Sequence, residues 1–211
     1  MNRLALALSM LASLAGPPAS GQSVRMGLVA GRSSAWQSGT LAYSGSRNAV
    51  TAGIRLARGV TGGIAVQLDV LYSEAGAGTS PDLLHVDYIT APLLVKLTPL
   101  PHARLQPVAL GGVAPAVEVG CTATYYSGNP ADSSQGAPVA CASRRSRYTD
   151  WGLVVGGGVE LIVRGVTLSA TARYTHGIVN LASGIGPQTP PPSLYNRSVS
   201  VCLAAVFGPS E

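Results

Sequence analysis

The sequence predicts an all-β protein, an eight-stranded antiparallel up-and-down β-barrel that crosses a membrane. Three observations predict this fold. Charged residues make up only 11% of the 211 residues, apolar and other residues alternate with period two in eight segments, and short turns alternate with long polar connections. A soluble domain carries roughly 25% charged residues. Period-two alternation indicates strands with two different faces, and the alternating connections are typical of transmembrane barrels with short periplasmic turns and long extracellular loops.

The chain begins with an expected signal peptide, residues 1–21. A basic start at Arg3 is followed by an apolar run from Leu4 to Ala15 and by small residues that suit cleavage after Gly21. This run is too short for a spanning helix, which needs about 18 or more apolar residues. Residues 22–211 then form one exported barrel domain.

The eight expected strands follow the signal peptide in order. Each has roughly the ten residues that a tilted strand needs to cross a bilayer. They are Val24 to Ala35, Asn48 to Arg58, Gly63 to Ser73, Leu84 to Leu97, Arg104 to Val119, Asp150 to Val163, Val166 to His176, and Asn196 to Phe207. Pro92 lies inside the fourth segment and predicts a bulge or bend, because proline lacks a ladder donor.

The connections between these segments alternate in length. Short turns at 59–62, 98–103 and 164–165 follow the second, fourth and sixth segments. Long polar connections follow the first, third, fifth and seventh segments. The chain therefore predicts a meander that closes into a barrel, with all the long loops at one end.

The aromatic residues gather at the long-loop end. Phe207 alone maps to the other end, whereas the rest lie beside or within long connections: Trp36, Tyr43, Tyr72, Tyr88, Tyr125, Tyr126, Tyr148, Trp151, Tyr174 and Tyr195. Aromatic rings prefer the interface between lipid and water. We therefore expect an aromatic girdle at that interface.

The alternation places charged and polar side chains inside the barrel. The expected polar network of the lumen is Arg25, Arg55, Gln67, Asp69, Lys96, Glu118, Glu160 and Arg173. If Val163 faces Val166 across the turn, Glu160 and Arg173 lie roughly 13 Å apart along the ladder at the usual strand rise. Different partners are therefore expected: an arginine or Lys96 for Glu160, and a carboxylate such as Asp69 for Arg173.

Cysteine and arginine residues give further expectations for the fifth connection. Cys121 and Cys141 are candidate disulfide partners in an oxidising, exported compartment, and the small lumen residue Cys202 is left unpaired. No histidine or second cysteine stands at ligand spacing, which argues against a metal. The run that contains Arg144, Arg145 and Arg147 is either a contact for lipopolysaccharide phosphates or a solvated loop.

Several stretches resemble a known family, the outer membrane protein beta-barrel domain family, whose members are often called porin family proteins. They are VDYITAPLLVKL at 86–97, WGLVVGGGVEL at 151–161, LSATARYTHGIVN at 168–180 and the closing NRSVSVCLAAVF. The resemblance implies an outer-membrane barrel in a Gram-negative envelope and little about activity. Barrels of this kind commonly end on an aromatic residue that assists the barrel assembly machinery, whereas four residues follow Phe207 here.

The expected function is a structural or interaction role, in which the loops meet an extracellular protein or surface ligand. We expect a monomer in contact with outer-membrane lipid and lipopolysaccharide, with no cofactor and no enzymatic activity. The net charge of +5 comes from scattered arginines in an exported chain, which argues against nucleic acid as a partner.

Two alternatives stay open. One is a lipid-modifying enzyme that uses His176, which resembles the histidine of lipid A deacylases; here Gly177 and Ile178 stand where their serine is expected. The other is a narrow porin-like channel, although eight strands leave an interior that side chains fill.

Overall fold

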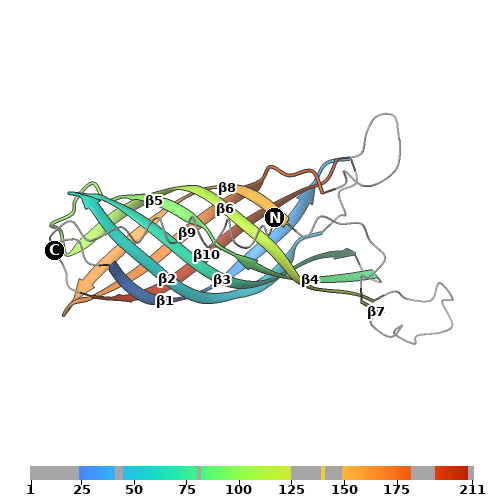
Figure 1. Ribbon diagram of the computed structural model, residues 1–211, viewed down its shortest axis with the longest axis horizontal. Helices are drawn as coiled ribbons and strands as arrows, with labels where there is room; N and C mark the ends of the chain where they lie inside the picture. The colour runs from blue at the N-terminus through green and yellow to red at the C-terminus, as the bar shows by residue number, and fades with distance from the viewer. Residues whose placement is uncertain are drawn as a thin grey trace, which may run out of the picture.

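The computed structural model describes residues 24–40, 45–79, 82–124, 139–140, 149–181 and 193–208. Within them the chain forms a closed antiparallel barrel of eight strands (Figure 1). No helix in these ranges is long and apolar enough to cross a membrane. The expected signal peptide lies outside the described residues.

The barrel strands follow one another around the wall in chain order, and the first pairs with the last. They are β1 (Val24–Ser38), β2 (Arg47–Thr61), β3 (Ile64–Thr79), β4 (Asp82–Thr90) with β5 (Leu93–Leu97), β6 (Leu105–Thr124), β8 (Thr149–Val163), β9 (Val166–Gly177) and β10 (Tyr195–Phe207). The two-residue strand β7 (Val139–Ala140) pairs with β6 beyond the barrel wall.

Pro92 interrupts one barrel strand, as the sequence predicts. Strands β4 and β5 stand on either side of Ala91 and Pro92, and both pair with β3 and β6. Around the break the backbone amide of Ala91 donates to the carbonyl of Pro115 at 2.9 Å, and that of Asp69 donates to the carbonyl of Pro92 at 3.1 Å. The sheet therefore stays continuous across the proline.

The third connection differs from the expected long loop. Strands β3 and β4 continue to pair as far as Thr79 and Asp82, so most of the expected loop is a two-stranded ribbon. Strand β6 follows it and pairs with β4 as far as Thr124. The glycine and alanine residues of this segment suggest a loop by composition. Their small side chains nevertheless allow the backbones of β3 and β4 to keep pairing.

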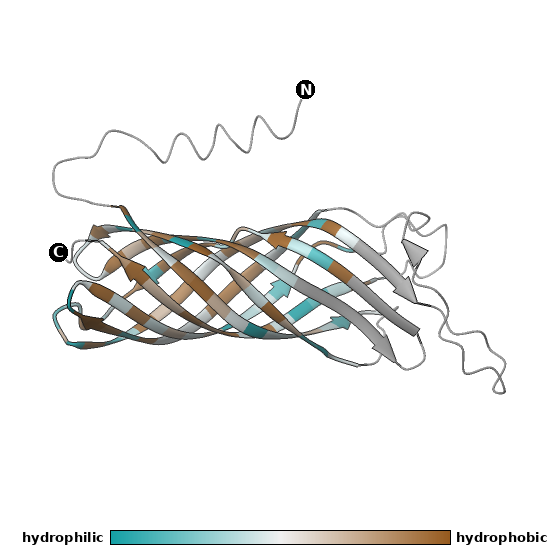
Figure 2. Cartoon of the chain, turned by 90° about the horizontal axis from the view of Figure 1, so that it is seen from below, coloured by the Kyte–Doolittle hydropathy of each residue, from teal (hydrophilic) through white to brown (hydrophobic). Residues whose placement is uncertain are grey.

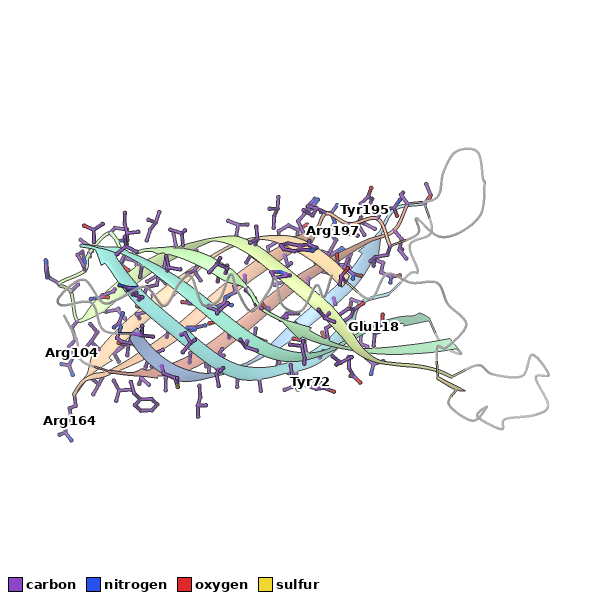
Figure 3. The ribbon with its side chains drawn as sticks, in the orientation of Figure 1. Tyr72, Arg104, Glu118, Arg164, Tyr195 and Arg197 are labelled. Carbon is purple, nitrogen blue, oxygen red and sulfur yellow. The ribbon has the colours of Figure 1, made fainter. Side chains whose placement is uncertain are left out.

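The turn between β8 and β9 has the predicted register, in which Val163 faces Val166. Arg164 and Gly165 join them with positive φ angles of 49° and 82°. Two successive residues with positive φ are typical of a type I′ hairpin turn, whose twist matches that of the strands. Arg164 lies with Arg104 at the short-turn end of the barrel (Figure 3).

The outer surface of the barrel is apolar. Side chains such as Leu28, Val155 and Leu203 are 66%, 60% and 64% exposed, and they stand at alternate positions along their strands. Figure 2 shows hydrophobic residues alternating with more polar ones along the barrel body. The intervening residues face the lumen, where polar and charged side chains are buried. An apolar exterior around a polar interior suits a barrel surrounded by lipid.

Candidate functional site in the barrel lumen

Four side chains meet in the middle of the lumen, and we call them the central cluster: Arg55, Gln67, Asp69 and Arg173. Asp69 is fully buried. Its two carboxylate oxygens accept hydrogen bonds from Arg55 Nε at 2.8 Å and Arg55 Nη2 at 3.0 Å. Arg173 Nη1 lies 2.8 Å from Asp69 Oδ2, and Gln67 Nε2 donates to both oxygens at 3.2 Å. Asp69 is therefore the shared acceptor of the cluster.

The central cluster spans the lumen from wall to wall. Asp69 lies on β3 and Arg173 on β9, and these strands are four steps apart in either direction around the barrel. Arg55 of β2 makes a second contact with the opposite wall, because its Nη1 donates to Ser169 Oγ of β9 at 2.9 Å. Since side chains from opposite walls touch, the lumen is closed at this height.

A separate ion pair lies closer to the short turns. Lys96 Nζ of β5 is 2.7 Å from Glu160 Oε2 of β8, and both side chains are buried. Glu160 faces Ser169 in the ladder, whereas Arg173 faces Gly156. The two charges of the β8–β9 hairpin thus have different partners, Lys96 and Asp69. Arg25 lies near the same end, with its Nη1 3.4 Å from Thr167 Oγ1.

Gly156 makes room for Arg173. A Cβ atom on Gly156 would collide with the carbonyl oxygen of Ala172 and would lie 3.1 Å from Arg173 Cγ. The close approach of the β9 backbone therefore requires glycine here, and the missing side chain also leaves space for the stem of Arg173.

A cavity of about 170 Å³ lies above the central cluster, toward the long-loop end. Arg173 is the lining residue of β9 nearest the short turns, while Thr175 and Gly177 line the cavity higher up. Apolar side chains such as Leu71 and Val154 form much of the wall. The cavity therefore has a cationic floor and a largely apolar wall.

Asp150 lies at the upper wall of this cavity. Its Oδ1 accepts the backbone N–H of Trp151 at 2.7 Å, and its Oδ2 accepts Asn196 Nδ2 at 2.8 Å. Asp150 starts the sixth expected strand but was not among the residues predicted for the lumen network. Its inward alternation, in step with Glu160 on the same strand, is the signal that could have found it.

Tyr88 was expected in the aromatic girdle, and the structure instead places it in the lumen. It lines the cavity and interacts with Glu118, Asp150 and Asn196. The ladder between β4 and β6 shifts between Asp87 and Tyr88, so that Tyr88 faces Glu118. Alternation along the same segment agrees with this position, because Val86 and Thr90 line the cavity as well and Lys96 is buried. The expectation of a girdle residue rested only on the position of Tyr88 near the end of its strand. Glu118 is partly exposed near the long-loop end (Figure 3).

Aromatic and polar residues gather on the outer surface of β1, β9 and β10. The rings of Trp36 and Tyr174 are 6.3 Å apart, and Tyr174 meets His176 edge to face at 6.4 Å. Arg197, labelled with Tyr195 in Figure 3, donates from Nε to Ser38 Oγ at 3.0 Å and has Nη1 3.5 Å from the Tyr174 hydroxyl. Such amphipathic groups suit the level of lipid headgroups.

His176 is exposed on this outer surface, where its ladder neighbours are Leu153 and Arg197. Within the part of the chain that the structure describes, no hydrogen bond joins it to a serine or carboxylate. A nucleophile and its base must lie within hydrogen-bond reach of one another. The described surroundings of His176 therefore do not form a hydrolase site.

Arg32 is a charged residue that the sequence reasoning missed. It is exposed on the outward face of β1, where Val50 and Val201 flank it in the ladder. Period-two counting from Leu28 along the same strand is enough to place it outside. Long arginine side chains can extend toward the membrane surface while their stems cover apolar area.

The remaining predicted residues differ in how far the structure describes them. Cys202 is buried in the lumen as a free thiol. Cys121 belongs to β6, but its side chain lies outside the described residues, as do Cys141, Arg144, Arg145 and Arg147. Tyr43, Tyr125, Tyr126 and Tyr148 lie outside them too. Among the residues described, no group of three or more histidine, cysteine, aspartate or glutamate side chains could hold a metal ion.

The closed barrel, its apolar exterior and its buried polar lumen define the class of the protein: a small eight-stranded outer-membrane β-barrel, located in the outer membrane. No protein-family model matches the chain. No curated protein matches it either.

Solved structures of small barrels are similar to the chain in general form. Neisserial surface protein A is 18% identical, with a TM-score of 0.47, over 89% of this chain and 100% of that chain. The attachment invasion locus protein Ail of Yersinia pestis is 8% identical, with a TM-score of 0.45, over 88% and 99%. The outer membrane protein AlkL is 17% identical, with a TM-score of 0.40, over 92% and 96%. At these values the likeness concerns the form of the barrel alone.

Proposed function

We propose that the protein is a non-conducting outer-membrane barrel with a structural or interaction role at the cell envelope. The observation that carries this proposal is the contact of 2.8 Å between Asp69 and Arg173 across the full width of the lumen. A solute would have to separate buried, paired charges in order to pass. Breaking such a pair costs roughly 3–5 kcal/mol, so the barrel is better suited to anchoring and presenting its outer segments than to conduction.

The ribbon at the long-loop end supports the interaction role. Strands β3 and β4 pair out to Thr79 and Asp82, and β6 runs beside them to Thr124 (Figure 1). A paired ribbon holds its backbone in a fixed shape, which lowers the entropic cost of meeting a partner. We therefore assign the contact with an extracellular protein or surface ligand to this end.

Conductance in planar bilayers tests the proposal. The purified, folded barrel is added to the bilayer, and a larger channel-forming porin serves as the positive control. The expected result is no steady opening of the protein, while its altered gel mobility before boiling shows that the sample is folded. Steady single-channel steps from the folded sample would overturn the proposal in favour of the narrow channel.

Lipopolysaccharide contact through Arg144, Arg145 and Arg147 is part of the proposal. Arginine binds phosphate oxygens with paired hydrogen bonds. The test is lipopolysaccharide affinity after all three are changed to alanine, with Arg104→Ala at the opposite end of the barrel as the matched control. We expect weaker binding for the triple variant alone, and equal binding of both variants would remove this contact from the proposal.

The monomeric state, the disulfide between Cys121 and Cys141 and insertion by the barrel assembly machinery also belong to the proposal. Thiol labelling of the unfolded chain tests the disulfide: it should modify Cys202 alone before reduction and all three cysteines after it. Labelling of all three cysteines before reduction would argue against the bond.

A further inference from the structure

Arg173 is buried but leaves two of its three guanidinium nitrogens without a partner. The residue is 4% exposed, and its Nη1 lies 2.8 Å from Asp69 Oδ2. Neither Nε nor Nη2 has a hydrogen-bond partner among the residues that the structure describes. Buried polar groups in proteins nearly always have such partners, so this edge of the side chain requires an explanation.

The unpartnered edge has the geometry that binds a carboxylate. In the same cluster, Arg55 uses its own Nε and Nη2 to hold the two oxygens of Asp69, at 2.8 Å and 3.0 Å. Paired donors of this kind match the spacing of carboxylate oxygens. Arg173, which lines the cavity, therefore has a free pair of donors like the pair that Arg55 uses inside the cluster.

The charge around this edge favours an anion. Asp69 is the one carboxylate that either arginine of the central cluster contacts, so the cluster carries one positive charge in excess among the described residues. The next carboxylate of the lumen below, Glu160, is bound to Lys96. Asp150 lines the cavity six residues beyond Gly156, the ladder partner of Arg173, which is roughly 20 Å at strand rise.

The cavity above Arg173 sets the size and polarity of what can bind there. Its volume is about 170 Å³, and Leu71, Val86, Ala114 and Val154 contribute apolar wall. A cavity of about 150 Å³ with apolar walls is large enough for benzene. The space therefore suits a ligand with a small apolar body and one anionic end that points down to Arg173.

We propose that the upper lumen is a binding site for a small monocarboxylate with an apolar body, held by Arg173 Nε and Nη2. The carboxylate supplies the two acceptors that this edge lacks and balances the excess charge of the central cluster. The apolar body fills the space between the walls of β3, β6 and β8. The site opens away from the sealed cluster, so binding involves no passage through the barrel and is independent of the role proposed for the outer segments.

Calorimetric titration of the barrel in lipid nanodiscs tests this site, with benzoate as the probe and benzyl alcohol as its neutral counterpart. We expect saturable binding of benzoate in the millimolar range or tighter, and binding of benzyl alcohol at least about tenfold weaker, which is the factor expected for one lost hydrogen bond to a charged group. Equal binding of the two compounds, or binding of neither, would overturn the proposal.

Three variants assign the binding to its residues. Arg173→Gln should weaken the binding of benzoate by about tenfold or more, because it removes the charge and the paired donors. Ala116→Leu leaves Arg173 in place and should weaken the binding of both compounds, because Ala116 lines the cavity and the larger side chain fills part of it. Arg104→Gln, exposed at the opposite end of the barrel, is the matched control for charge and should bind as the natural chain does. Unchanged benzoate affinity in a folded Arg173→Gln barrel would contradict the site.

Discussion

Replacing Asp69 with asparagine tests the central cluster most severely. The change keeps the volume of the side chain but removes the one carboxylate that Arg55 and Arg173 both contact. Asparagine also presents an N–H₂ group where one carboxylate oxygen accepted hydrogen bonds. Both guanidinium groups would then stay in the lumen without a counter-charge.

The cost of this change follows from the burial of the three groups. Asp69, Arg55 and Arg173 are 0%, 1% and 4% exposed, so water cannot replace the lost acceptor. Removing one partner of a buried ion pair destabilises a protein by roughly 3–5 kcal/mol. We expect Asp69→Asn to lower the free energy of unfolding by at least about 3 kcal/mol, since it leaves two cations rather than one.

Urea unfolding of the barrel in phospholipid vesicles measures this loss. The fluorescence of Trp36 and Trp151 and the gel mobility before boiling should report the same transition if unfolding is two-state. Arg173→Gln is the matched control, because Asp69 keeps both bonds from Arg55, and its cost should stay below about 2 kcal/mol. A free energy of unfolding for Asp69→Asn within about 0.5 kcal/mol of that of the natural chain, or equal losses for the two variants, would contradict the role of Asp69 as the shared acceptor.

Other residues give further predictions. Lys96→Met leaves Glu160 buried without its partner and should lower the free energy of unfolding by roughly 3–5 kcal/mol in the same assay. Adding Glu160→Gln should recover part of this loss, and no recovery would argue against the pairing. Arg164→Asn should raise the free energy of unfolding by about 0.5–1 kcal/mol, since asparagine tolerates positive φ in a type I′ turn, whereas a loss would contradict the turn assignment. His176→Ala should leave the mass of lipid A unchanged in cells that express the barrel, and a modification seen only with the natural chain would favour the enzyme.

Much of the barrel is predictable from the sequence because strand geometry is local. Side chains alternate between the two faces of a strand, so the positions of Arg55, Gln67 and Asp69 on the inner face follow from the apolar residues between them. The two-residue turn at Arg164 and Gly165 fixes the register of β8 and β9 and hence the separation of Glu160 from Arg173. Their two different partners follow from that separation.

The shape of the central cluster could not be predicted in the same way. Asp69 accepts hydrogen bonds from β2, β3 and β9 because closure of the barrel brings opposite walls together, and the stagger of a closed barrel is not a local property. The lumen position of Tyr88 did follow from alternation, since Val86 and Thr90 line the same cavity; the girdle expectation used only its place near the end of the strand. The outward position of Arg32 also follows from simple alternation along β1.

The central claim is that an apolar outer surface meets lipid while a sealed polar lumen lies within, and spin labels along β10 test it most directly. Labels are placed one at a time at 199–203 in a chain whose cysteines are otherwise serine, and collision with oxygen, which dissolves in lipid, is measured in bilayers. Positions 199, 201 and 203 should show high accessibility to oxygen and little contact with a water-soluble reagent, whereas positions 200 and 202 should show low accessibility to oxygen. Uniform accessibility to oxygen along the strand, or free access of the water-soluble reagent to positions 199, 201 and 203, would contradict the claim.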